Sequence, residues 1–285
     1  LLLIIGVITA LYTTLGGQSG VAYSDAAQFA WFLGSTILVV ILVIVGAGGW
    51  SSVYQRALET RGPEFFSITL PHKDLPPLTI LAFVVQGLFF AASPVGGEGF
   101  TAQRFMAAKN EFHAQVGQFF NAALTIVVRV FPILLLGIVA AAIFPLNTIE
   151  PEKAWALMVK KYVPTGFGIY GILVAGLLAG YMSTIATEMN WGASYLVNDV
   201  YKRLLKPMAS ASHYANVGRV CSILLFAASL VFGYYFVKGM ASWFLFINSV
   251  VFAFFLPLSW LRFFWWRLNI YGEAAALILG LPLGY

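Results

Sequence analysis

Long uncharged apolar runs dominate the chain, and they predict membrane-spanning helices. Four stretches without a charged residue, 26–50, 75–97, 162–187 and 239–261, each exceed the about 20 residues that a helix needs to cross a bilayer. Together with their apolar neighbours they predict eight spans, at about 1–16, 24–47, 76–97, 114–145, 164–190, 216–237, 240–261 and 270–285. We therefore expect an all-α integral membrane protein that forms a single transmembrane domain over 1–285.

The composition agrees with this class. Hydrophobic residues make up 60% of the chain and charged residues 9%, and the mean hydropathy is +0.87. Such values are typical of a multi-pass membrane protein rather than a soluble domain. The net charge of +5 is spread over short linkers, so the bilayer is an expected partner and nucleic acid is not.

Residue types that carry catalysis are sparse. Cys221 is the one cysteine, which leaves no disulfide and no cysteine metal pair. The three histidines fall in linkers, and no phosphate-binding, HExxH or GxSxG motif occurs. We therefore expect no enzymatic activity. A lipid-modifying membrane enzyme and a channel are alternatives, but the sequence has neither a titratable cluster nor a filter-like repeat.

Both ends of the chain lie inside apolar runs. The sequence begins at Leu1 without a methionine and stops at Tyr285. No basic region precedes the first apolar run, as it would in a signal peptide. We expect this chain to be a fragment of a longer protein.

Glycines and hydroxyls share one helix face within the run 176–187. At helical spacing, the members of this face are Gly176, Gly180, Ser183, Thr184 and Thr187. In a membrane helix such a face either packs closely against a neighbour or supplies oxygen ligands to a cation. The hydroxyls of Ser183 and Thr184 and the carbonyl of Gly180 would suit sodium. Spacing alone leaves both interpretations open.

Charged residues within the apolar segments have several interpretations. Arg129 lies in a segment that must cross the membrane, where a charge costs about 2.5 kcal/mol or more unless it meets water or a partner. It could bind a carboxylate or hydroxyl solute, pair with Glu98 or Glu188, or extend to the interface. Asp25 follows the Gly16-Gly17 turn, where we expect it to cap the next helix.

Two predicted helices contain breaks. The segment 76–97 ends in Ser93, Pro94 and a run of glycines, and the segment 114–145 contains Pro132. Irregular backbone at membrane depth is tolerated where it is buried in protein or lines a cavity, and transporters bind solute and ions at such breaks. The candidate substrate-binding residues are Gln86, Ser93, Glu98, Arg129 and Asn248.

Three motifs in order along the chain resemble the sodium:solute symporter family, which includes carriers of proline, glucose, pantothenate and sialic acid. YTTLGGQSGVAYSDAAQ at 12–28 is similar to the family's YTxxGGxxAVxxTDxxQ stretch. QRFMAAKN at 103–110 is similar to its QRxLAAKs loop. AGYMST at 179–184, closed by NDVYKR at 198–203, resembles its AAxMST helix.

The resemblance implies a LeuT-like core of two inverted repeats. Residues 1–47 would end the first repeat, 76–261 would form the second, and 270–285 would begin a peripheral helix. Ser183 and Thr184 match the family's sodium-coordinating hydroxyls, and Gly180 matches its carbonyl ligand. Asp25 matches an acid that lies close to the sodium route, although Ser24 replaces the usual threonine before it.

The function implied is secondary active transport, in which sodium and a small organic solute cross the membrane together by alternating access. The solute could be a sugar, an amino acid or a carboxylate, and the inner membrane of a bacterium is the expected location. The main alternative is a transporter-like membrane sensor fused to a signalling module, which sequence beyond residue 285 would reveal.

Overall fold

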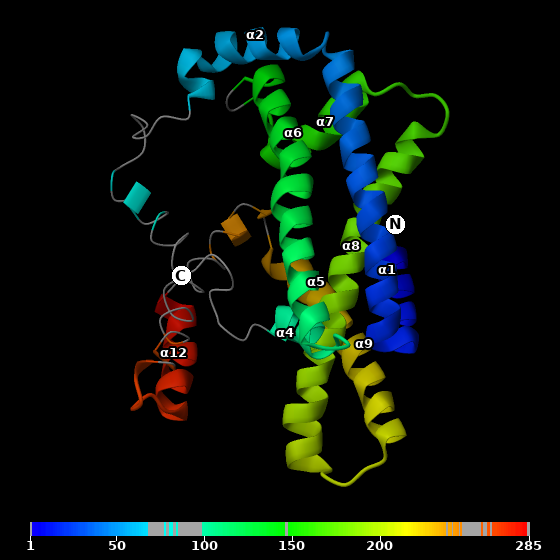
Figure 1. The fold of residues 1–285 in the computed structure, drawn as a ribbon, viewed down its shortest axis with the longest axis vertical. Coiled ribbons are helices and arrows are strands. Elements are labelled where there is room, and N and C mark those ends of the chain that lie inside the picture. Colours follow the sequence, from blue (N-terminus) through cyan, green and yellow to red (C-terminus); the bar gives the residue numbers. More distant parts are fainter. Residues whose placement is uncertain are drawn as a thin grey trace. The chain divides into compact units, whose positions relative to one another are not determined.

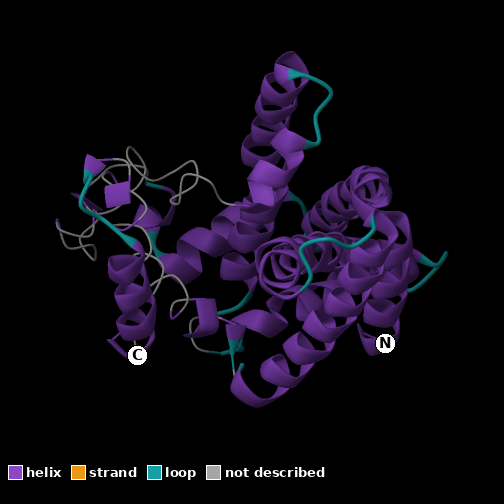
Figure 2. Cartoon of the chain, turned by 90° about the horizontal axis from the view of Figure 1, so that it is seen from below, coloured by secondary structure: helices purple, strands orange, loops and turns teal. Residues whose placement is uncertain are grey.

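The computed structural model describes residues 2–67, 99–145, 148–237 and 264–283, with isolated residues between 77 and 84 and between 239 and 262. Within these residues every regular element is a helix (Figure 2). The chain divides into two compact units, Leu1–Ser67 with Met106–Ser229, and Ile68–Phe105 with Leu230–Tyr285. The all-α prediction is confirmed for the described part of the chain.

Four helices in the described residues are long and apolar enough to cross a membrane: Ser19–Gly46, Glu111–Ile143, Ile169–Leu205 and Ala211–Phe236. They correspond to the spans predicted at 24–47, 114–145, 164–190 and 216–237. A shorter apolar helix, Leu3–Gly17, corresponds to the first predicted segment. The segments predicted at 76–97 and 240–261 lie mostly outside the described residues.

Helix α1 (Leu2–Gly46) is two helices joined at Gly17, whose φ of 56° and ψ of −158° interrupt the helical geometry. Glycine adopts a positive φ without the clash that a Cβ would cause. The second helix begins at Ser19, several residues before the predicted start at 24. Asp25 therefore lies inside this helix, and the prediction that it caps the helix N-terminus is wrong.

The second long span has a widened turn in its middle. It runs through α5 (Glu111–Ala123), the π-helix η2 (Leu124–Arg129) and α6 (Val130–Ile143). Pro132 is the third residue of α6, and a proline removes one backbone donor and crowds the carbonyl four residues earlier. A π turn accommodates such a defect without ending the helix. At the break predicted around Pro132 the helix is therefore widened locally and continues into α6.

The third span is longer than predicted. Helix α8 (Ile169–Tyr195) continues into the π-helix η4 (Leu196–Leu205), and a short turn leads to α9 (Ala211–Phe236). The predicted spans 164–190 and 216–237 leave a linker over 191–215, but the first proline after this helix begins is Pro207, so no proline stops the helix earlier. The resulting hairpin extends past the other helices of its unit (Figure 1).

Helices α1 and α8 lie side by side and pack closely (Figure 1). A Cβ placed on Gly176 would collide with the side chain of Ser35, and one on Gly180 would come within 3.0 Å of the Phe32 ring. The small face of α8 is therefore a packing seam, as one of its two interpretations predicted. Close approach of the helices also brings their polar groups together.

The buried core of this unit lies where α1 and α8 meet three further helices. These are α2 (Trp50–Arg61), α6 and α7 (Ala154–Tyr162). The most deeply buried side chains are Val39, Val43, Val53, Ala57, Val139 and Leu173. The short 3-10 helix η1 (Pro63–Phe66) follows α2, and the short 3-10 helix η3 (Pro151–Lys153) precedes α7.

Helix α2 is attached to the end of α6 by a charged side chain. Arg61 donates from Nε to the carbonyl of Ala141 at 3.1 Å, and from Nη2 to the carbonyl of Phe144 at 3.0 Å. These carbonyls lie at the C-terminal end of α6, where a cation is favourable. Helix α2, which lies between the predicted spans 24–47 and 76–97, is thus ordered against the bundle.

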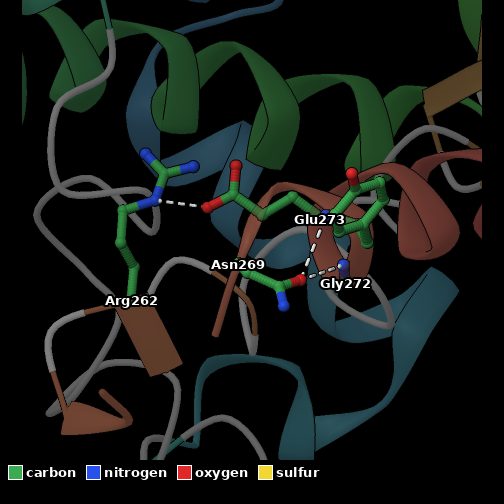
Figure 3. Close-up of polar contacts among 5 residues, drawn as sticks. Arg262, Asn269, Gly272 and Glu273 are labelled. Atoms are coloured by element: carbon green, nitrogen blue, oxygen red, sulfur yellow. Dashed lines mark hydrogen bonds and ion pairs between the residues drawn. The ribbon is translucent and has the colours of Figure 1, made fainter. Parts of the chain in front are cut away.

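The other unit contains most of α4 (Gly99–Met106) and the helix α12 (Ile270–Leu283). Asn269 caps α12, because its Oδ1 accepts from the backbone nitrogens of Tyr271 and Gly272, both at 3.1 Å (Figure 3). Arg262 Nε donates to Glu273 Oε1 at 3.0 Å in the first turn of the same helix (Figure 3). A helix starting at 270 was predicted, and the structure confirms it.

Candidate functional site

Asp25 joins α1 to α8 through two hydroxyls. Ser183 Oγ donates to Asp25 Oδ1 at 2.7 Å, and Thr187 Oγ1 donates to Asp25 Oδ2 at 3.1 Å. Ser183 and Thr187 are four residues apart and so lie on one face of α8. Thr187 is only 2% exposed. A carboxylate whose two oxygens both accept hydrogen bonds is fixed in orientation inside the helix pair.

The hydroxyl of Thr184 donates its hydrogen bond within α8 and not to Asp25. Its Oγ1 donates to the carbonyl of Gly180, one turn earlier in α8, at 3.1 Å. This back-bonding is common for threonine in membrane helices. Since the hydrogens of Ser183 and Thr184 are both used within the protein, their oxygens offer lone pairs to a ligand.

A pocket of about 460 Å³ opens beside these hydroxyls. Its lining comes from α1, η2 and α8 of one unit: Gln28, Phe29, Phe32, Arg129, Leu177, Gly180, Tyr181, Ser183, Thr184 and Ile185. The structure therefore brings together the three residues for which a sodium role was foreseen on α8. Ser183 lies between this pocket and Asp25, since it lines the pocket and bonds the carboxylate.

Arg129 reaches the same pocket from the π turn η2. Among the described residues it has no hydrogen-bond or ion-pair partner, so the pairing with Glu188, one of the alternatives for this residue, is not formed. Arg129 is half-buried and adds a positive charge to the pocket wall. The other candidate substrate-binding residues, Gln86, Ser93, Glu98 and Asn248, lie outside the described residues.

Sequence reasoning missed three residues that contribute here. Thr187 was placed on the small face of α8 but was not foreseen as a partner of Asp25. Tyr12 donates from its hydroxyl to the carbonyl of Met182 at 3.4 Å, and Gln28 Nε2 donates to that hydroxyl at 3.3 Å. Tyr12 and Gln28 stand at the two ends of the motif at 12–28, which was the available signal.

The oxygen atoms near Asp25 are suitable ligands for a hard cation. A carboxylate, two hydroxyls and a helix carbonyl are all oxygens, the ligands that alkali and alkaline-earth cations prefer. Within the residues that the structure describes, no group of three histidine, cysteine or acidic side chains could hold a metal ion. The arrangement around Asp25 therefore fits sodium better than a transition metal.

A second pocket, of about 430 Å³, lies at the kink of α1. Arg219 of α9 lines it and donates from Nε to the carbonyl of Thr14 at 3.1 Å and from Nη1 to Asn216 Oδ1 at 2.8 Å. Thr14 lies in the last turn before Gly17, where helix carbonyls lose their intrahelical donors. Arg219 thus ties the first half of α1 to α9 at the kink.

These features define a multi-pass helical membrane protein with an oxygen-rich pocket between two closely packed helices. The model of the sodium:solute symporter family matches residues 1–280, and the chain belongs to that family. The resemblance of the three motifs is therefore confirmed.

Individual relatives are cotransporters. The chain is 27% identical over 324 residues to sodium/myo-inositol cotransporter 2 of Oryctolagus cuniculus, covering 98% of this chain and 45% of that protein. It is 26% identical over 236 residues to the sodium/glucose cotransporter of Vibrio parahaemolyticus, covering 75% of this chain and 42% of the relative. The chain thus spans less than half the length of these relatives. None of these names supports the sensor alternative.

A solved structure shares the fold. It is described as "Substrate-bound outward-open state of a Na+-coupled sialic acid symporter reveals a novel Na+-site", and it matches with a TM-score of 0.65 at 18% identity. The match covers 98% of this chain and 55% of the other. At this identity the likeness concerns the fold alone.

Proposed function

We propose that this chain is part of a secondary active transporter that moves sodium and a small organic solute together across the membrane. The observation that carries the proposal is the position of Asp25, which accepts from Ser183 and Thr187 beside a pocket lined by Ser183 and Thr184. Membership of the sodium:solute symporter family and the names of the cotransporter relatives support it.

Sodium would bind through the hydroxyls of Ser183 and Thr184 and the carbonyl of Gly180, with Asp25 supplying the negative charge. Both hydroxyls have given their hydrogens to Asp25 or to the Gly180 carbonyl, so their lone pairs are free for a cation. The carboxylate next to Ser183 would lower the energy of the ion in the low-dielectric interior. The described residues that line this pocket include no carboxylate, and Asp25 is linked to the pocket through Ser183.

The solute would meet Arg129 in the same pocket. A guanidinium without a partner among the described residues can donate hydrogen bonds to a hydroxyl or a carboxylate. Myo-inositol and glucose, named for the relatives, carry hydroxyls, and sialic acid, named for the similar structure, also carries a carboxylate. We propose a polyol, a sugar or a sugar acid as the solute class.

We further propose the architecture expected from the family: about eight segments, with 1–47 ending one repeat, 76–261 forming the inverted second repeat and 270–285 beginning a peripheral helix. The four long helices, the shorter Leu3–Gly17 and the shared fold support it. A site between α1 and α8 would then join two repeats, so that ion binding favours one of two conformations. The inner membrane of a bacterium is the proposed location.

The test is uptake by the full-length protein reconstituted into vesicles. A panel of labelled myo-inositol, glucose and sialic acid is offered with an inward sodium gradient and, as the control, with sodium replaced by choline. We expect at least one solute to accumulate only with sodium. Uptake that is indifferent to sodium for every solute transported would overturn the proposal.

A further inference from the structure

One polar atom at the pocket has no partner. The side-chain oxygen Oε1 of Gln28 is buried and makes no hydrogen bond, although Gln28 lines the pocket beside Ser183 and Thr184. A buried acceptor without a donor is unfavourable, because it has lost its hydrogen bonds to water and gained none in exchange. Native proteins keep few such atoms, and one that borders a binding pocket suggests a ligand that supplies the missing interaction.

The packing of α1 on α8 places Gln28 at the level of the hydroxyls. Asp25 bonds to Ser183 and Thr187, whereas further along α1 the ring of Phe32 meets Gly180. The two helices therefore run antiparallel, since higher numbers on α1 meet lower numbers on α8. Gln28 lies between Asp25 and Phe32 on α1, so it faces the stretch between Thr187 and Gly180, which contains Ser183 and Thr184.

The orientation of the amide follows from its neighbours. The hydroxyl hydrogen of Tyr12 is donated to the Met182 carbonyl, so this hydroxyl can only accept from Gln28. The nitrogen Nε2 must face Tyr12, because the opposite flip would set two oxygen acceptors against each other. The oxygen Oε1 is thereby left as the end without a donor.

We propose that Gln28 Oε1 is a further ligand of the sodium ion. This inference rests on the proposed function, which supplies the ion. Three residues that line the pocket then carry side-chain oxygens that can only accept: Gln28 Oε1 has no hydrogen, and the hydrogens of Ser183 and Thr184 are donated to the protein. A set of lone pairs with no hydrogen to offer attracts a cation.

Burial of the oxygen favours the ion over the solute. Water does not reach Gln28 Oε1, and a solute hydroxyl is at least as bulky as water. A dehydrated sodium ion is smaller than a water molecule and can approach an oxygen that water cannot. The amide oxygen thus completes an ion site more readily than a solute site.

The experiment measures binding of radioactive sodium to the purified full-length protein without solute, and then the KM of the transported solute. Gln28→Leu removes the oxygen, and Gln28→Glu keeps an oxygen at the same length but no longer donates to Tyr12 when ionised. Tyr12→Phe is the matched control, since it removes the hydroxyl and leaves the amide oxygen. A melting curve checks that each variant is folded, and Gln28→Met replaces Gln28→Leu if the latter is not.

We expect Gln28→Leu to weaken sodium binding about tenfold or more, equivalent to about 1.4 kcal/mol. Gln28→Glu should bind sodium at least as well as the parent protein, and Tyr12→Phe should lose much less than Gln28→Leu. A rise in solute KM with unchanged sodium binding would instead assign Gln28 to the solute. Equal losses in all three variants would reduce Gln28 to a positioning residue for Tyr12. Either result overturns the inference, while a parent protein that binds no sodium refutes the proposed function itself.

Discussion

Ser183 donates a 2.7 Å hydrogen bond to Asp25, a residue 158 positions away on another helix. Together with the bond from Thr187, this contact links the two halves of the candidate ion site. It also explains why an acidic residue is kept inside a membrane helix, where an unpaired charge is costly. The following predictions concern the full-length protein.

Asp25→Asn should weaken sodium-dependent uptake strongly. The substitution keeps the size of the side chain but removes the negative charge beside Ser183 and leaves at most one carbonyl oxygen to accept from Ser183 and Thr187. Loss of one charged hydrogen-bond acceptor costs about 1.5–3 kcal/mol, which corresponds to a rise of about tenfold to a hundredfold in the sodium concentration for half-maximal uptake. Asp25→Glu, which keeps the charge, is the control and should lose less.

Thr184→Val should raise the sodium requirement without unfolding the protein. Valine matches threonine in shape, and the lost hydrogen bond is a local one to Gly180. We expect the sodium concentration for half-maximal uptake to rise about fivefold to thirtyfold, for a loss of about 1–2 kcal/mol. Thr184→Ser restores the hydroxyl and should recover most of the affinity. An unchanged sodium dependence in Thr184→Val would count against this ligand.

Arg129→Leu should affect the solute more than the ion. The guanidinium lines the pocket without a protein partner among the described residues, so its removal leaves no buried acceptor unsatisfied there. We expect the KM for the solute to rise about tenfold or more, because a hydrogen bond to a charged group contributes about 1.5–3 kcal/mol. Sodium binding measured without solute should stay the same or become tighter. Weaker sodium binding would contradict the assignment.

Gly176→Ala should destabilise the α1 and α8 pair. The added Cβ would collide with Ser35, and overpacking of this kind costs about 1–3 kcal/mol. The expected result is a lower melting temperature of the detergent-solubilised protein. Gly171→Ala on the same helix has open space and is the matched control. The double variant Gly176→Ala with Ser35→Gly should recover stability, and failure to do so would show that the collision is not the cause.

Arg219→Gln should loosen the kink of α1. Arg219 supplies a charged donor to the Thr14 carbonyl at the end of the first half of α1. Glutamine cannot replace it, because its side chain is shorter and carries no charge. We expect a lower melting temperature and faster proteolysis near residues 14–17. Arg203→Gln, an exposed cation in η4, is the comparison variant and should change neither.

Much of the helix pattern could be predicted from the sequence. Apolar runs located the four long spans, because the bilayer requires about 20 predominantly apolar residues per crossing. The predicted helix ends were less accurate than the helix positions. Helix α8 continues as η4 through 196–205 because no proline follows until Pro207. The second half of α1 starts at Ser19 because Gly17 alone makes the kink. Breaker residues set these boundaries more sharply than hydropathy does.

The sequence by itself determined the family, the small face of α8 and the hydroxyls of Ser183 and Thr184, since motifs and helical periodicity are properties of the chain alone. Only the tertiary structure decided that Asp25 pairs with Ser183 and Thr187, and that Gln28 and Arg129 reach the same pocket. These contacts depend on the register and the rotation of α1 relative to α8. That register is set by close packing at Gly176 and Gly180, which no single helix encodes.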